Sequence, residues 1–156
     1  MESSKLSLDR TDRRILEALQ LDGRLSNAEL ARRVGLSESA CLRRVRLLEE
    51  SGIVAGVVLL VDQARAGKPG NIFVEITTDA QEDHAPAEFE EAIAELPEVM
   101  ECYLMSGEYD YLVRVIAADF ADYGRIHAAL TKLPHVVRIR SSFTLRTITK
   151  KTEIPL

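Results

Sequence analysis

The fold of this chain is decided by the stretch from Ser26 to Gly52, which reads SNAELARRVGLSESACLRRVRLLEESG. Ser26 followed three residues later by Glu29 is a capping-box pattern, and it predicts a helix that begins at the next residue. Gly35 suits the positive φ found just past a helix end, and Ser37 can cap a second helix, so only two residues separate the two elements. This spacing predicts a helix-turn-helix unit, in which the second helix is offered to the major groove of DNA.

The charges of this second helix fall on one side. At 100° per residue, Cys41, Val45 and Leu48 share one face, and the polar and basic positions lie on the other faces. Five arginines stand between residues 32 and 46 against one acid, Glu38, which gives a local charge of +4 in a chain of −5. A solvated basic face is the alternative explanation, but together with the caps and the turn the pattern favours DNA contact. The residues predicted to contact DNA are Ser37, Ser39, Ala40, Arg43, Arg44, Arg46, Arg32 and Arg33.

Separate roles follow from position and chemistry along this helix. The small side chains of Ser39 and Ala40 let the start of the helix lie close to base edges. Arg43 is placed to pair with guanine, whereas Arg44 and Arg46 are better suited to hold phosphates.

Length and composition limit the class of protein. The 156 residues fit one domain or two small ones, and 46% hydrophobic with 29% charged residues is typical of a soluble globular protein. Cys41 and Cys102 form no CxxC and no secretory leader is visible, so we expect a cytoplasmic protein. The longest apolar run, Ile53 to Val61, is about half of what a membrane-spanning helix needs, so no membrane partner is expected.

Charge is divided unevenly along the chain. Residues 1–61 hold ten Lys/Arg and nine Asp/Glu, a net charge of +1, and residues 62–156 hold ten and sixteen, a net charge of −6. This asymmetry suits an N-terminal part that binds DNA, here called the head, joined to a C-terminal part whose negative charge DNA repels.

The head is completed on both sides of the helix-turn-helix. Asp9 can open a helix with apolar residues at helical spacing, which should stop by Gly23. The β-branched run Ile53–Val61 predicts a strand that leads out of the head. Gly and Pro then mark a linker, so we predict a DNA-binding domain at residues 1–61, a linker at 62–70 and a second domain at 71–156.

The second domain shows strands of period two alternating with helices. Strands are predicted at 71–78, 99–106, 111–117 and 136–147, and helices at 87–96 and 120–132. The motif Leu-Pro-x-Val occurs twice, at residues 96–99 and 133–136, each time where a predicted helix ends and the next strand begins. This repeat indicates two β-α-β units in series. This order predicts a ferredoxin-like βαββαβ domain, and the fold class of the chain is α+β.

One face of such a sheet has no helix to cover it. Aromatic and aliphatic residues mixed with opposite charges are typical of a subunit interface, so self-association is predicted. A dimer also suits a helix-turn-helix protein on a palindromic site. The residues expected on this face are Phe73, Glu75, Glu101, Tyr103, Leu112, Arg114 and Ile116.

The sequence resembles the Lrp/AsnC family, the feast/famine regulators of bacteria and archaea. The resemblance covers nearly the whole chain and is carried by Leu8-Asp9-Arg10-Thr11-Asp12, Asp22-Gly23-Arg24, Val34-Gly35-Leu36-Ser37, Cys41-Leu42-Arg43-Arg44-Val45, Glu101-Cys102, Ser106-Gly107-Glu108-Tyr109-Asp110-Tyr111-Leu112 and Leu133-Pro134. It implies a winged-type helix-turn-helix domain followed by a RAM-type domain that dimerises and senses a small molecule, usually an amino acid. It also implies that dimers assemble into tetramers or octamers.

The effector of this family typically sits between dimers. The resemblance implies that it contacts Leu104, Gly107, Glu108, Tyr109, Asp110, Phe120, Ser142, Phe143, Thr144 and Leu145. Backbone N–H groups near Gly107 suit an α-carboxylate, and Asp110 suits an α-ammonium. Without the resemblance, the motif of residues 106–111 is better explained as a strand–strand corner than as a ligand site. No cofactor beyond this amino-acid effector is expected.

Two other functions compete with regulation of transcription. Some proteins of this fold are sirohaem decarboxylases, but the three histidines have no metal-ligand spacing, and no GxGxxG or Ser/His/Asp arrangement is visible. We therefore predict no catalytic residues, no metal ligands and no enzyme activity. The other alternative is a sensing or assembly module whose head has lost DNA binding, and the five arginines around the turn argue against that loss.

Overall fold

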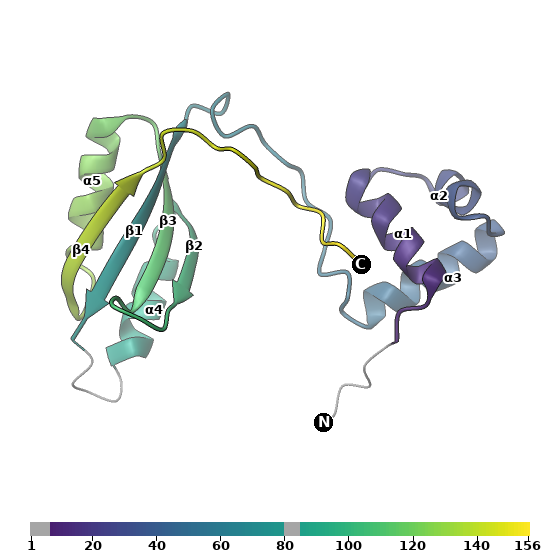
Figure 1. Cartoon of the computed structure of the whole chain (residues 1–156), viewed down its shortest axis with the longest axis horizontal. Helices are drawn as coiled ribbons and strands as arrows, with labels where there is room; N and C mark the ends of the chain where they lie inside the picture. The colour runs from purple at the N-terminus through teal and green to yellow at the C-terminus, as the bar shows by residue number, and fades with distance from the viewer. Residues whose placement is uncertain (1–6, 80–84) are drawn as a thin grey trace. The chain divides into compact units, whose positions relative to one another are not determined.

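The computed structural model describes residues 7–79 and 85–156, which form two compact units (Figure 1). Residues 7–60 and Ile148–Leu156 make up a helical unit, and Val61–Thr147 make up a sheet unit. The last nine residues therefore belong with the helices, although the sequence assigned them to the second domain. The side chain of Gln20 holds them there, because it donates a hydrogen bond to the Ile154 carbonyl (3.1 Å) and accepts one from the Ile154 N–H (2.6 Å).

Helix α1 spans Arg10–Leu21 and begins at a complete capping box. The Asp9 carboxylate accepts a hydrogen bond from the Asp12 N–H (2.8 Å), and the Asp12 carboxylate accepts one from the Asp9 N–H (3.2 Å). These bonds satisfy N–H groups that the first turn leaves without helical partners.

Helices α2, Asn27–Val34, and α3, Glu38–Glu50, form the predicted helix-turn-helix. Ser26 and Glu29 make the second capping box, which confirms the expected start of α2. Gly35 ends α2 with φ of 73°, a left-handed conformation that only glycine adopts without strain. The two helices therefore lie at the close spacing that the sequence predicts.

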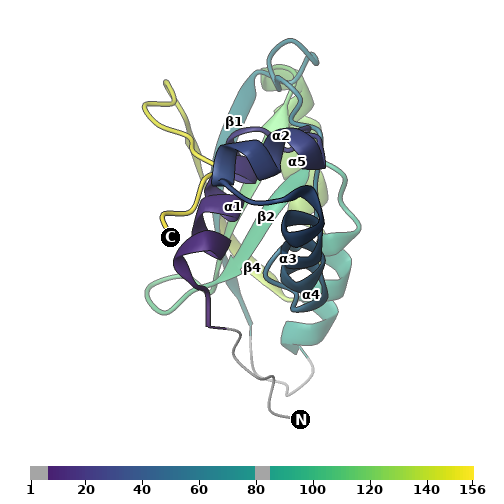
Figure 2. The ribbon, with the colours of Figure 1, turned by 90° about the vertical axis from the view of Figure 1, so that its right-hand side faces the viewer.

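A small core joins the three helices of this unit, and Figure 2 shows α2 lying crosswise to α1 and α3. Ile15 of α1, Leu30 of α2, and Cys41 and Leu48 of α3 are almost completely buried together. Cys41 and Leu48 come from the apolar face predicted for α3, which leaves the opposite face of that helix in solvent.

The strand predicted over Ile53–Val61 is absent, and this prediction was wrong. Residues 55–62 belong to no helix or strand, and the side chains from Val57 to Val61 are 67–78% exposed. A run of β-branched residues becomes a strand only when a neighbouring strand accepts its backbone hydrogen bonds, and the described chain offers none. Within the described residues, no helix is both long and apolar enough to cross a membrane.

The sheet unit has the predicted βαββαβ order. Its elements are β1 (Gly70–Thr78), α4 (Ala85–Ala94), β2 (Val99–Leu104), β3 (Tyr111–Ala117), α5 (Phe120–Leu130) and β4 (Val136–Phe143). The strands pair antiparallel in the order β2-β3-β1-β4, and α4 and α5 lie against one face of the sheet (Figure 1). Strand β4 ends at Phe143, four residues before the predicted end.

Alternation along the strands divides the side chains between two faces. Ile72, Val74 and Ile76 of β1 are buried beneath the helices with Phe89 and Ile126. The residues between them point to the open face, as predicted. Phe73 and Tyr103 remain 36% and 51% exposed there, so this face retains apolar surface in a single copy of the chain.

Candidate functional site

The exposed side of α3 presents the basic residues that the sequence assigned to DNA. Ser39, Arg43 and Arg46 are exposed, and neither arginine has an ion pair or a side-chain hydrogen bond within the described part of the chain. Buried Cys41 and Leu48 fix the rotation of the helix about its axis. The two guanidinium groups are therefore free to meet phosphates or base edges.

Two leucines lie on this same side of α3, and no pattern in the sequence predicted a role for them. The groove along α3 is lined by Ser39, Leu42, Arg43, Arg46, Leu47 and Glu50. Leu42 and Leu47 are 40% and 42% exposed between the arginines. An apolar side chain in a major groove contacts the methyl group of thymine, so these leucines can add to base recognition.

Arg44 is engaged inside the protein. Its guanidinium donates hydrogen bonds of 2.7 Å to the carboxylates of Asp9 and Asp12, at the start of α1. The Asp12 N–H and then the Arg44 guanidinium lower the pKa of Asp9, and the Asp12 carboxylate raises the pKa of Arg44. The contact links α3 to α1, whereas the phosphate contact predicted for Arg44 stays a prediction.

Of the remaining residues predicted to contact DNA, some have a structural role and others are exposed to solvent. The Ser37 hydroxyl accepts a hydrogen bond from the Ala40 N–H (3.3 Å), so it caps α3, and Ala40 is half-buried. Arg32 and Arg33 are exposed in the last turn of α2, where positive charge complements the helix dipole. Their DNA contact stays a prediction.

In the sheet unit, the corner of residues 105–110 joins β2 to β3. The Asp110 carboxylate accepts hydrogen bonds from the Thr78 N–H (2.7 Å) and the Thr78 hydroxyl (3.1 Å). The Met105 N–H donates to the Asp110 carbonyl (2.7 Å), which closes the corner. Asp110 therefore fastens the corner to the end of β1, a structural role that the sequence motif did not reveal.

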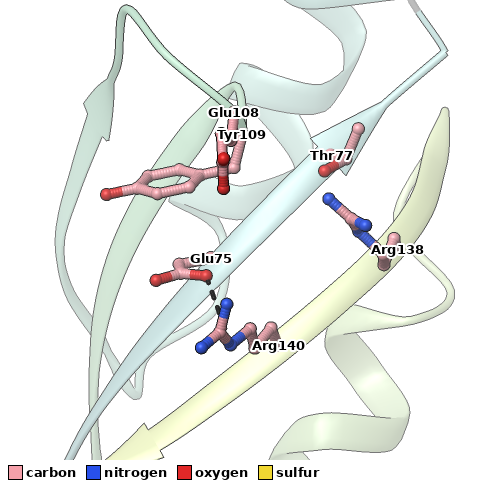
Figure 3. Close-up of a pocket in the computed structure, with 6 residues that line it drawn as sticks. All are labelled: Glu75, Thr77, Glu108, Tyr109, Arg138 and Arg140. Atoms are coloured by element: carbon pink, nitrogen blue, oxygen red, sulfur yellow. Dashed lines mark ion pairs between the residues drawn. The ribbon is translucent and has the colours of Figure 1, made fainter.

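A pocket of about 140 Å³ opens on the sheet beside this corner (Figure 3). It is lined by Glu75 and Thr77 of β1, Glu108 and Tyr109 of the corner, and Arg138 and Arg140 of β4. Arg140 and Glu75 form a long ion pair, with 3.7 Å between Nε and Oε2. Two of the predicted effector residues, Glu108 and Tyr109, are thus part of a charged pocket whose other members the sequence did not identify.

Leu104, Gly107 and Asp110 also lie at this corner, whereas the remaining predicted effector residues lie at the opposite end of the sheet. Thr78 pairs with Val136 near the corner, and Ile72 pairs with Phe143 at the far end. Six residues of strand separate these ends, which is about 20 Å. The structure therefore does not bring the corner residues Leu104, Gly107, Glu108, Tyr109 and Asp110 together with Phe120, Ser142, Phe143, Thr144 and Leu145 in one chain.

The far group is an exposed aromatic cluster. The rings of Phe120 and Phe143 stack at 6.0 Å, and Tyr123 meets Phe143 edge-on at 5.0 Å. Phe120 is 79% exposed and Leu145 is 99% exposed, whereas Tyr123 is buried, and its burial raises the pKa of its hydroxyl. This cluster offers apolar contact at the end of the sheet.

No metal centre is visible in the part of the chain that the structure covers. Among residues 7–79 and 85–156, no three His, Cys, Asp or Glu side chains come together in a way that could hold a metal ion.

Family models match both units. Residues 8–55 match a model described as winged helix-turn-helix DNA-binding, and residues 71–154 match one described as the Lrp/AsnC ligand binding domain. Among characterised proteins, the chain is 41% identical over 150 residues to the Bkd operon transcriptional regulator of Pseudomonas aeruginosa, covering 96% of this chain and 98% of that one. It is 37% identical over 148 residues to the leucine-responsive regulatory protein of Escherichia coli, covering 94% and 90%.

Solved structures agree with these matches. An AsnC family transcriptional regulator from Agrobacterium tumefaciens has a TM-score of 0.91 at 37% identity, covering 95% of this chain and 97% of that one. A transcriptional regulator from Neisseria meningitidis, solved as a complex with L-Met, has a TM-score of 0.91 at 35% identity, covering 96% and 97%.

Proposed function

The chain belongs to the Lrp/AsnC family of transcriptional regulators, and we propose that two copies of it bind a palindromic operator in double-stranded DNA and respond to an amino acid. The observation that carries the DNA-binding part is the free basic face of α3. Arg43 and Arg46 are exposed there, and a buried core holds the helix that carries them. Two such helices at a fixed separation can read two half-sites of a duplex.

Dimerisation through the open face of the sheet would set that separation. Phe73 and Tyr103 expose apolar surface on this face, and Glu75 and Arg140 add opposite charges. Such a mixture is typical of subunit interfaces, and a two-fold dimer would present two heads to a palindrome. We further propose that dimers assemble into tetramers or octamers.

An amino acid is the effector that we propose. A structural neighbour binds L-Met, and one relative is named leucine-responsive. The corner and the aromatic cluster of this chain lie about 20 Å apart, too far for one amino acid to touch both within one copy. An effector that contacts both groups would therefore lie between copies, where it can bias the state of assembly.

The relatives are regulators of transcription, which implies that the chain is not an enzyme. We propose that it has no catalytic activity, no cofactor other than its effector, and a cytoplasmic location. The sirohaem decarboxylase alternative is tested by the absorbance of sirohaem during incubation with the protein. A spectral change that depends on the protein would contradict the proposal.

The decisive experiment selects binding sites from a randomised DNA library with the full-length protein. Arg43→Ala should weaken the preference at one base pair of each half-site by about 1–3 kcal/mol. Arg65→Ala removes a guanidinium of the sheet unit and serves as the matched control, with the selected sequence unchanged. A wild-type protein that sediments as a monomer, or that protects no DNA at low salt, would refute the proposed function.

A further inference from the structure

Two leucine side chains border the basic groove along α3. Leu42 and Leu47 both line this groove, and each exposes about two fifths of its surface. A single exposed leucine is ordinary on a protein surface and needs no function. These two share one groove with the exposed arginines Arg43 and Arg46, so the surface that α3 offers to DNA is partly apolar as well as basic.

The rotation of α3 places the two leucines on opposite flanks of the basic surface. Successive residues of a helix are about 100° apart, so Arg43 and Arg46 lie about 60° from each other, on the side opposite buried Leu48. By the same geometry, Leu47 lies about 40° beyond Arg43. Leu42 lies about 40° beyond Arg46 in the other direction. The two arginines therefore occupy the middle of the exposed face, with one leucine on each side.

The chemistry of the major groove limits what these flanks can contact. Phosphate oxygens and the acceptors of guanine suit arginine, but a leucine cannot form hydrogen bonds with them. Thymine alone among the four bases carries an apolar group in this groove, the methyl group on C5. When a helix lies in the major groove, its two flanks face the two strands of the duplex. Leucines on opposite flanks would therefore meet thymines of opposite strands.

We propose that Leu42 and Leu47 help to determine the operator sequence by packing against the methyl groups of two thymines, one on each strand of the half-site. This inference rests on the proposed function, because it names further bases that α3 recognises beside the guanine proposed for Arg43. Burial of one methyl group changes the affinity by about fourfold. Arg46 contacts phosphate in this arrangement and adds affinity for any sequence.

Exchange of thymine for deoxyuridine tests the two contacts. Deoxyuridine keeps the pairing with adenine and the O4 acceptor, and it lacks only the methyl group. The operator that the full-length wild type selects from the randomised library is synthesised with one thymine of each half-site exchanged at a time. Fluorescence anisotropy at a fixed salt concentration then gives the dissociation constants. We expect two positions, on opposite strands, at which the exchange weakens wild-type binding by about fourfold for each half-site.

The leucine variants identify which side chain makes each contact. Leu42→Ala should lose the sensitivity to deoxyuridine at one of the two positions and keep it at the other, and Leu47→Ala should do the reverse. A variant that is merely less stable would bind both DNAs more weakly by the same factor, so this coupling reports the contact itself. Leu21→Ala is the matched control, because Leu21 of α1 is 72% exposed and lies outside the groove, and it should keep both sensitivities.

Three outcomes separate failure of this inference from failure of the proposed function. If the wild type selects no sequence and protects no DNA, the proposed function fails, and the leucine contacts fail with it. If an operator is selected but deoxyuridine changes the affinity at none of its thymines, or changes it equally in the wild type and both variants, only the leucine contacts fail. If Leu42→Ala or Leu47→Ala lowers the sedimentation coefficient and keeps both sensitivities, the leucines belong to a contact between copies of the chain.

Discussion

Substitution of Arg44 should damage the stability of the helical unit, whereas substitution of Arg46 should damage DNA binding. The Arg44 guanidinium is 27% exposed, and its Asp12 partner is 12% exposed, so water screens this ion pair only in part. A charge-assisted hydrogen bond is worth about 1.5–3 kcal/mol, and partial exposure reduces this value. Arg44→Gln should therefore lower the free energy of unfolding of this unit by about 1–2 kcal/mol.

Thermal unfolding and salt titration measure the two effects separately. A loss of 1 kcal/mol shifts the Tm of a domain of about 60 residues by about 4–8 °C. Arg46→Gln should leave the Tm within about 2 °C, and it should reduce the salt slope of DNA binding by about 0.9 per head, or about 1.8 for two heads. The salt slope of Arg44→Gln should match that of the wild type. An unchanged Tm together with a reduced salt slope in Arg44→Gln would refute this reasoning. That result would support the phosphate contact that the sequence predicts for Arg44.

Two further predictions concern the sheet unit. The hydrogen bond from the Ala118 N–H is the main cause that holds the pKa of Asp122 well below its ordinary value. The ionised carboxylate therefore stabilises the fold above about pH 4, and this contribution is lost as the pH falls below that value. The urea midpoint of the wild type should therefore drop more between pH 6 and pH 3 than that of Asp122→Asn, and equal drops would contradict the assignment. A Cβ at Gly70 would lie 2.8 Å from the Ala117 carbonyl oxygen, so Gly70→Ala should cost about 1–3 kcal/mol of unfolding free energy. Gly124→Ala, at an open position within α5, is the control and should raise the unfolding free energy by about 0.5–1 kcal/mol. A lower unfolding free energy in this control variant would contradict the steric explanation.

The local parts of the fold could be predicted from the sequence because their causes are local. Ser26 and Glu29 lie three residues apart, so the sequence shows both halves of the capping box. The alternation along β1 likewise separates Phe73 from Val74 without knowledge of the partner strand. Most element ends agree with the predictions within about two residues, as expected where caps and turns decide them.

Long-range pairing could not be predicted in this way. Arg44 and Asp9 are 35 residues apart in the sequence. The periodicity of α3 does not indicate which of its arginines forms an ion pair with a carboxylate of another helix. The same limit explains Val57–Val61, whose β-branched residues favour a strand but have no partner strand within the described chain. Asp110 was correctly placed at the corner, yet its bond to Thr78 depends on a strand that lies 32 residues earlier.

The separation of the two predicted effector groups has a consequence for regulation. If the amino acid is held by the charged pocket of one copy and by the aromatic cluster of Phe120 and Phe143 of another, its affinity must depend on how many copies are assembled. Linkage is reciprocal, so an effector that binds the assembly more tightly must also stabilise that assembly by the same factor. The affinity for the amino acid should then rise with protein concentration until assembly is complete. A pocket that is complete in one copy would instead give an affinity independent of concentration, and the change in assembly would need another cause.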